Sequence, residues 1–102
     1  MESWQPSTAS ELEAIVAKQL LACSLKQQEA FAAYRVPFYP VPLSRLGSIE
    51  SALVVAELPT GLLYFEDVEE GFEIGTLDPS GVLPDQSCNQ LDLTHVLHRA
   101  GL

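Results

Sequence analysis

The chain has 102 residues, of which 47% are hydrophobic and 19% charged, and its formal net charge is −9. These proportions are ordinary for one globular domain and argue against a disordered chain. No apolar run approaches the roughly 20 residues that span a bilayer, and the N-terminus lacks the basic and apolar regions of a signal peptide. We therefore expect a soluble cytoplasmic domain over residues 1–102, in which residues 1–9 can form a disordered arm.

The negative charge belongs entirely to the second half of the chain. Residues 1–45 contain four acidic and four basic residues, whereas residues 46–102 contain ten acidic residues and one basic residue, Arg99. Such a surface repels the phosphates of nucleic acid, whose recognition needs lysine and arginine. It also accelerates encounters with basic proteins. The charge therefore argues against direct nucleic-acid binding and favours a basic protein partner.

Two helices are expected in the first third of the chain. Capping boxes can begin at Thr8 or Ser10, each three residues before a glutamate. Apolar residues then recur at helical spacing: Leu12, Ile15, Val16, Leu20 and Cys23. Another capping box begins at Ser24, and the helix that follows it has the core candidates Leu25, Phe31 and Tyr34. Pro37 ends this second helix, because the residue before a proline is pushed out of the helical region.

A proline-rich segment, residues 36–47, follows the helices. Pro37, Pro40 and Pro42 lack the N–H groups that a central strand needs, so an edge strand or a polyproline-like connector is expected. Aromatic and aliphatic side chains lie between the prolines. This interleaving favours packing onto the domain over a proline-recognition ligand.

Three strands are expected next, at 48–58, 61–68 and 72–77. The turns between them are too short for a parallel crossover, so the strands pair antiparallel. Residues 78–81, Asp-Pro-Ser-Gly, match a type I turn, and residues 82–84 predict a further short strand. The apolar runs at 53–56 and 62–65 do not alternate with polar residues, so apolar side chains point to both faces of the sheet. We therefore expect both faces to be shielded from water there. Helices can cover one face, and the other can meet the rest of the chain, a partner or a second copy.

A C-terminal helix is expected within residues 85–102. Ser87 or Asn89 is its N-cap, and Gly101 is the residue that ends it. Its apolar face consists of Leu93, Val96, Leu97 and Ala100. The expected fold class is α+β, with two N-terminal helices, an antiparallel meander of three or four strands, and the C-terminal helix packed on the sheet.

The stretch "YFEDVEEGFEIG", residues 64–75, contains five acidic residues and no basic one. An EF-hand register with Gly71 at its sixth position puts apolar residues at two ligand positions, which argues against calcium. An acidic rim around aromatic side chains is typical of a recognition surface, and a solubilising cluster at an exposed hairpin tip is the alternative. The candidate partner-binding residues are Glu66, Asp67, Glu69, Glu70, Phe72 and Glu73.

Candidate metal ligands lie on the last helix. Asp92, His95 and His98 follow one helical stripe, and Cys88 could approach them. Zinc needs three or four ligands with supporting hydrogen bonds, and a polar helix face is the alternative. The chain contains neither a nucleophile elbow nor a phosphate loop, and Cys23 lies on an apolar face. We therefore expect no catalytic residue and no cofactor, and a protein that is not an enzyme.

Three segments carry a resemblance to known proteins: "ESALVVAE", "LLYFEDVEEGFE" and "CNQLDLTHVLH". Through them the chain resembles a family of small uncharacterised bacterial proteins, which implies a bacterial cytosolic origin. In size, acidity and fold class it is also similar to the immunity proteins of toxin systems. This likeness implies a non-enzymatic module that binds a basic partner such as a toxin. The alternatives are a metal- or small-molecule-binding domain on the C-terminal helix, and a structural dimer or accessory subunit.

Overall fold

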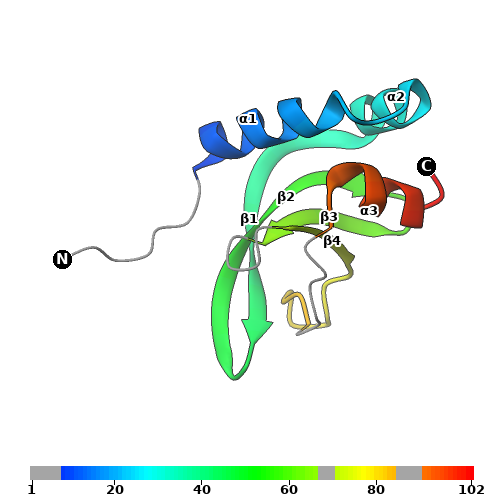
Figure 1. Cartoon of the computed structure of the whole chain (residues 1–102). Helices are drawn as coiled ribbons and strands as arrows, with labels where there is room; N and C mark the ends of the chain where they lie inside the picture. Colours follow the sequence, from blue (N-terminus) through cyan, green and yellow to red (C-terminus); the bar gives the residue numbers. More distant parts are fainter. Residues whose placement is uncertain (1–7, 67–70, 85–90) are drawn as a thin grey trace.

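The computed structural model describes residues 8–66, 71–84 and 91–102. Its elements in chain order are α1 (Ala9–Leu20), α2 (Leu25–Tyr34), β1 (Arg35–Arg45), β2 (Ser48–Leu58), β3 (Gly61–Glu66), β4 (Gly71–Gly75) and α3 (Leu93–Arg99). The strands form one antiparallel sheet in the order β1-β2-β3-β4, and the helices pack on one of its faces (Figure 1). The expected α+β class is confirmed. Within the described ranges, no helix is long and apolar enough to cross a membrane.

Local hydrogen bonds set three helix ends where the sequence predicts them. Thr8 caps α1 and Ser24 caps α2, each through a complete capping box. The alternative start at Ser10 is not used, and Thr8 and Ala9 belong to the helix start rather than to a disordered arm. Gly101 has a φ of 82° and ends α3 in a Schellman motif, because its N–H and the next one donate to carbonyls of the last turn.

β1 is an edge strand, as its prolines require. In its register with β2, the nitrogen atoms of Pro40 and Pro42 point away from β2, toward the outer edge of the sheet. The pairing of the two strands therefore needs no N–H donor at these positions. The segment after β4 forms hydrogen bonds with part of this outer edge of β1. Leu83 N–H donates to the carbonyl of Pro42 (2.8 Å), and Ser44 N–H donates to the carbonyl of Leu83 (2.9 Å). The strand expected at 82–84 is therefore a single parallel bridge between Leu43 and Leu83.

The two faces of the sheet carry separate apolar cores, as the uninterrupted apolar runs predict. Tyr64 and Phe65 are neighbours in β3 and enter different cores, because successive side chains of a strand point to opposite faces. Helix residues cover the Phe65 face, including Leu12, Val16, Phe31, Leu93, Val96 and Leu97. The opposite core contains Val41, Leu43, Ala52, Val54, Tyr64 and Leu83. Leu25 was expected in the core and is instead exposed.

α3 begins later than expected, and its first amide is capped by another helix. The N-cap position is Asp92, whose side chain makes no capping hydrogen bond. The expected caps, Ser87 and Asn89, lie outside the described residues. The side chain of Gln19 in α1 instead accepts a hydrogen bond from Leu93 N–H at 2.6 Å. Because the first amides of a helix have no partner within it, this contact couples the start of α3 to α1.

Removing the Gln19 side chain should loosen the start of α3. We expect Gln19→Ala to lower the free energy of unfolding by about 1 kcal/mol, the usual loss when a helix cap is removed, and to speed hydrogen exchange at Leu93 N–H. Chemical denaturation and amide exchange followed by NMR measure both effects. Lys18→Ala, at the exposed neighbouring position of α1, is the matched control and should change neither. An unaltered exchange rate at Leu93 would contradict the assignment.

Candidate functional site

The acidic stretch is turned inward wherever the structure describes it. Glu66 and Glu73 are each 3% exposed, and Phe72 is fully buried. The expectation of an exposed acidic hairpin therefore does not hold for these three side chains, which cannot contact a partner in this arrangement. The other acidic candidates lie outside the described residues: Asp67, Glu69 and Glu70.

Each buried carboxylate is paired with an arginine from a distant element. Arg45, at the end of β1, contacts Glu66 Oε1 through Nη2 and donates a hydrogen bond from Nε to Glu50 at 3.2 Å. Nη1 of Arg99 in α3 lies 3.3 Å from Oε1 of Glu73, which also accepts a hydrogen bond from the next backbone N–H. A buried charge is costly unless it is paired. These pairs explain how acidic residues can occupy the interior.

Three described side chains have shifted pKa values, and burial or local hydrogen bonds cause each shift. Burial, reinforced by the neighbouring Glu57, raises the pKa of Tyr39 to about 12, and its hydroxyl donates to that carboxylate at 2.8 Å. Hydrogen bonds, chiefly from the Ser80 hydroxyl at 2.6 Å, lower the pKa of Asp78 in the expected type I turn. Burial raises the pKa of the Cys23 thiol. A protonated phenol and a protonated thiol are poor bases and nucleophiles at neutral pH.

The candidate metal ligands of α3 are exposed and do not converge. Asp92 Oδ2 lies 3.9 Å from His95 Nδ1, and both side chains face solvent, as does that of His98. Among the residues that the structure describes, no group of three or more histidine, cysteine, aspartate or glutamate side chains could hold a metal ion. Cys88 lies outside these residues. Asp92, His95 and His98 therefore form a polar, solvent-exposed face of α3, which is the alternative to a metal site.

The structure includes two open pockets lined by described residues, and neither lining combines groups for catalysis. One surrounds the β2–β3 turn and is lined by Leu58, Pro59, Thr60, Leu62, Thr76 and Leu77, among others. The other lies between α1 and β3 and is lined by Ile15, Lys18, Gln19, Ala22 and Phe65. A catalytic site needs a nucleophile or base with an orienting partner, and these linings do not supply that combination.

The β1–β2 hairpin projects from the sheet, a feature that the sequence did not reveal (Figure 1). Over the described residues, the register of β2 with β3 ends at Leu53, whereas β1 and β2 remain paired as far as Arg45 and Ser48. The two turn residues are Leu46, with φ 49°, and Gly47, with φ 83°. Positive φ at both positions is the pattern of a type I′ turn, which matches the twist of the strands.

Leucine is an unusual residue at the first position of such a turn. Asparagine, aspartate and glycine are the residues that commonly take it, and the left-handed conformation costs other residues about 1–2 kcal/mol. Leu46 is nevertheless 87% exposed, and Ile49, three positions further on, is 65% exposed. The tip therefore presents two large apolar side chains to solvent, one of them held in a strained backbone conformation. Strain retained at an exposed position is a reason to look for a function there.

Comparison with known proteins finds no relative: no family model matches the chain, and no curated protein or solved structure is significantly similar to it. The resemblances seen in the sequence stay predictions. A function for this chain is therefore argued from its own side chains and their geometry.

Proposed function

We propose that the protein is a non-enzymatic protein-binding module that inserts the tip of the β1–β2 hairpin into an apolar groove of a basic protein partner. The observation that carries the proposal is Leu46, an apolar side chain presented to solvent from a strained position at the end of a projecting hairpin. Ile49 enlarges the apolar tip. A few large apolar side chains supply most of the energy of a typical protein interface.

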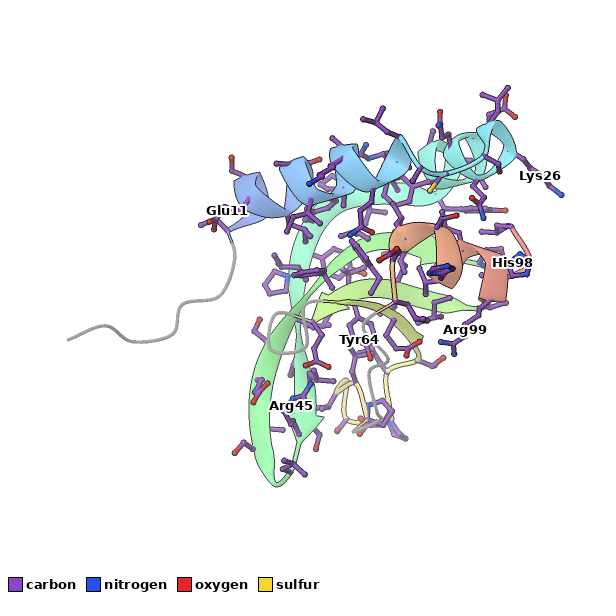
Figure 2. All side chains as sticks on the ribbon, viewed as in Figure 1. Glu11, Lys26, Arg45, Tyr64, His98 and Arg99 are labelled. Atoms are coloured by element: carbon purple, nitrogen blue, oxygen red, sulfur yellow. The ribbon has the colours of Figure 1, made fainter. Side chains whose placement is uncertain are left out.

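The ion pairs of Arg45 support this proposal because they fix the base of the tip. Arg45 directly precedes Leu46, and its guanidinium joins Glu50 within the hairpin to Glu66 in β3. Figure 2 places Arg45 on the projecting part of the hairpin, close to its end. A hairpin held in one orientation loses less conformational freedom on binding than a mobile loop. The tip is thus pre-organised to dock.

The charge of the chain supports a basic partner. The net charge of −9 lies in the half of the sequence that follows Arg45, and a field of this sign speeds the approach of a positively charged surface. Glu66 and Glu73 add little to this field, because each is buried and paired with an arginine, so the exposed acidic residues supply it. The likeness to immunity proteins supports a bacterial toxin that acts on nucleic acid, because such a protein presents a basic surface to its substrate.

Leu46→Asn should separate binding from folding. Because asparagine suits the left-handed turn position, we expect the variant to be about 1 kcal/mol more stable than the unmodified protein. We also expect it to bind the partner at least roughly tenfold more weakly, because it loses a central apolar contact. Thermal denaturation measures the first effect. Affinity capture from a bacterial lysate at low salt, followed by calorimetric titration of the protein identified, measures the second.

Leu77→Asn is the matched control, because it makes the same change at an exposed leucine outside the hairpin and should leave binding unaltered. Raising the salt concentration should weaken capture, since steering between opposite charges is screened. Full affinity in Leu46→Asn would refute the role of the tip. A partner retained equally at high salt would refute the basic surface, and no captured protein at low salt would argue against the module itself.

A further inference from the structure

We infer that the pocket between α1 and β3 binds a small apolar monocarboxylate. The carboxylate would lie at Lys18 and Gln19, and the apolar part of the molecule against Phe65. The pocket has a volume of about 420 Å³, within the range of about 300–1,000 Å³ that is usual for small-molecule sites. Its described lining residues belong to α1, the turn after it and β3, and none of them to the β1–β2 hairpin. The inference goes beyond the proposed function and does not depend on it.

One side of α1 forms the wall of this pocket. Ile15, Lys18, Gln19 and Ala22 occupy positions i, i+3, i+4 and i+7, which lie along one side of a helix, and the last of them is in the turn after α1. Phe65 closes the pocket from β3, where it belongs to the helix-covered core. Because Lys18 is exposed and Phe65 is buried, the charged end of a ligand would lie at the rim and its apolar end inside.

The ammonium group of Lys18 is not neutralised by a neighbouring acid. The positions three and four residues away along the helix are all apolar, so an ion pair within the helix cannot form: Ala14, Ile15, Leu21 and Ala22. Among the described residues, no carboxylate lies within ion-pair distance of this group. A single positive charge beside an apolar pocket is complementary to an anion that has an apolar body.

Gln19 supplies a second donor whose position is fixed. Its Oε1 accepts the hydrogen bond from Leu93 N–H at 2.6 Å, and this contact orients the amide group. The amide nitrogen of the same side chain donates to none of the described residues, and it carries two hydrogen atoms. It can therefore donate to a carboxylate that is bound at Lys18.

These two donors select the class of ligand. A carboxylate only accepts hydrogen bonds, so it matches both Lys18 and Gln19. An amine would be repelled by the ammonium group, and Gln19 Oε1 is already bonded to Leu93 N–H. A phosphate monoester carries nearly two negative charges at neutral pH, whereas the described lining offers one positive charge. A monocarboxylate with an apolar body is therefore the class that fits the pocket best.

The distribution of charge along the chain permits an anion at this site. The net charge of −9 lies after residue 45, whereas residues 1–45 have equal numbers of acidic and basic residues. The segment that forms the wall, residues 15–22, contains a single charged residue, Lys18. The wall of the pocket therefore attracts a monoanion, although the chain as a whole is acidic.

Titration of the full chain with sodium octanoate, followed by NMR of the backbone amides, tests the site. We expect saturable shifts centred on Lys18, Gln19, Ala22 and Phe65. Because the bound carboxylate holds Gln19, hydrogen exchange at Leu93 N–H should also slow. Octanol has the same tail without the charge, so it should bind roughly fivefold more weakly. The inference would be overturned if octanoate caused no saturable shift or shifts centred elsewhere, or if octanol bound as tightly as octanoate.

Lys18→Met tests the role of the charge. Methionine retains an unbranched apolar side chain, and the position is exposed, so folding should be unaffected. We expect octanoate to bind roughly fivefold more weakly to this variant and octanol to bind as it does to the unmodified protein. Unaltered octanoate affinity would refute the pairing of the carboxylate with Lys18.

Ala22→Glu tests where the carboxylate lies. The new side chain is four residues after Lys18 on the same side of the helix, so it can pair with the ammonium group and repel the ligand. We expect octanoate to bind at least roughly tenfold more weakly. Ala32→Glu makes the same change at an exposed alanine of α2, outside the pocket lining, and should leave binding unaltered.

Equal losses in Ala22→Glu and Ala32→Glu would attribute the effect to net charge and overturn the site. Both alanines are exposed, so both variants should fold. Capture of a protein partner through the hairpin tip should be retained in Lys18→Met and in both glutamate variants. Failure of the pocket is therefore distinguishable from failure of the proposed function.

Discussion

Arg45→Ala is expected to lower the free energy of unfolding by about 3 kcal/mol, because it leaves the carboxylate of Glu66 buried without its partner. The guanidinium of Arg45 is itself mostly buried and also donates to Glu50, so water cannot easily replace it. For a domain of this size the loss corresponds to a decrease in melting temperature of more than about 10 °C. Urea denaturation followed by circular dichroism measures the change in free energy.

A second substitution identifies the cause of this loss. Arg45→Ala combined with Glu66→Gln should recover part of the stability, because the variant no longer buries an unpaired charge. Arg35→Ala is a matched control: Arg35 pairs with Glu13 at 2.9 Å, but both side chains are substantially exposed, so we expect a loss below about 1 kcal/mol from that ion pair. Equal losses in Arg35→Ala and Arg45→Ala would contradict the view that burial makes the Glu66 pair important.

Leu83→Ala is expected to lower the free energy of unfolding by about 3 kcal/mol, the middle of the range for truncating a buried leucine. Leu83 is fully buried and packs into the core on the sheet face opposite the helices. Its backbone also bridges to β1 on both sides of Leu43. The substitution should therefore open this edge locally and speed hydrogen exchange at Ser44 N–H. Urea denaturation and amide exchange are the two measurements.

Leu77→Ala provides the comparison for Leu83→Ala, because it truncates an exposed leucine of the same connecting segment. We expect it to change the free energy of unfolding by less than about 0.5 kcal/mol. If Leu83→Ala were as mild as this control, the second core would contribute little to folding. An unaltered exchange rate at Ser44 would mean that the edge of β1 is protected without the packing of Leu83.

The candidate site shows where inference from the sequence fails. The composition of the acidic stretch predicts an exposed surface, because five acidic residues in a short span usually face water. Glu66 and Glu73 are nevertheless buried, since Arg45 and Arg99 reach them from elements far away in the sequence. The sequence does not predict the exposed tip of the β1–β2 hairpin. A leucine followed by glycine is not a recognised hairpin signal, and the projection of β1 and β2 past β3 depends on the register of three strands.

The sequence by itself determined the features that depend on neighbouring residues. Capping boxes set the starts of α1 and α2, Gly101 set the end of α3, Asp78 set its turn, and the prolines placed β1 at the edge of the sheet. Each of these rests on hydrogen bonds or backbone limits within a few residues, which a local pattern records.

Only the tertiary structure decided which acidic residues are buried, where α3 begins and which apolar side chains remain exposed. Gln19 caps Leu93 across 74 positions of sequence, and the arginine partners of Glu66 and Glu73 are likewise remote. Such contacts depend on the relative positions of whole elements in space. Their energies are decided by burial, which no local pattern of residues specifies.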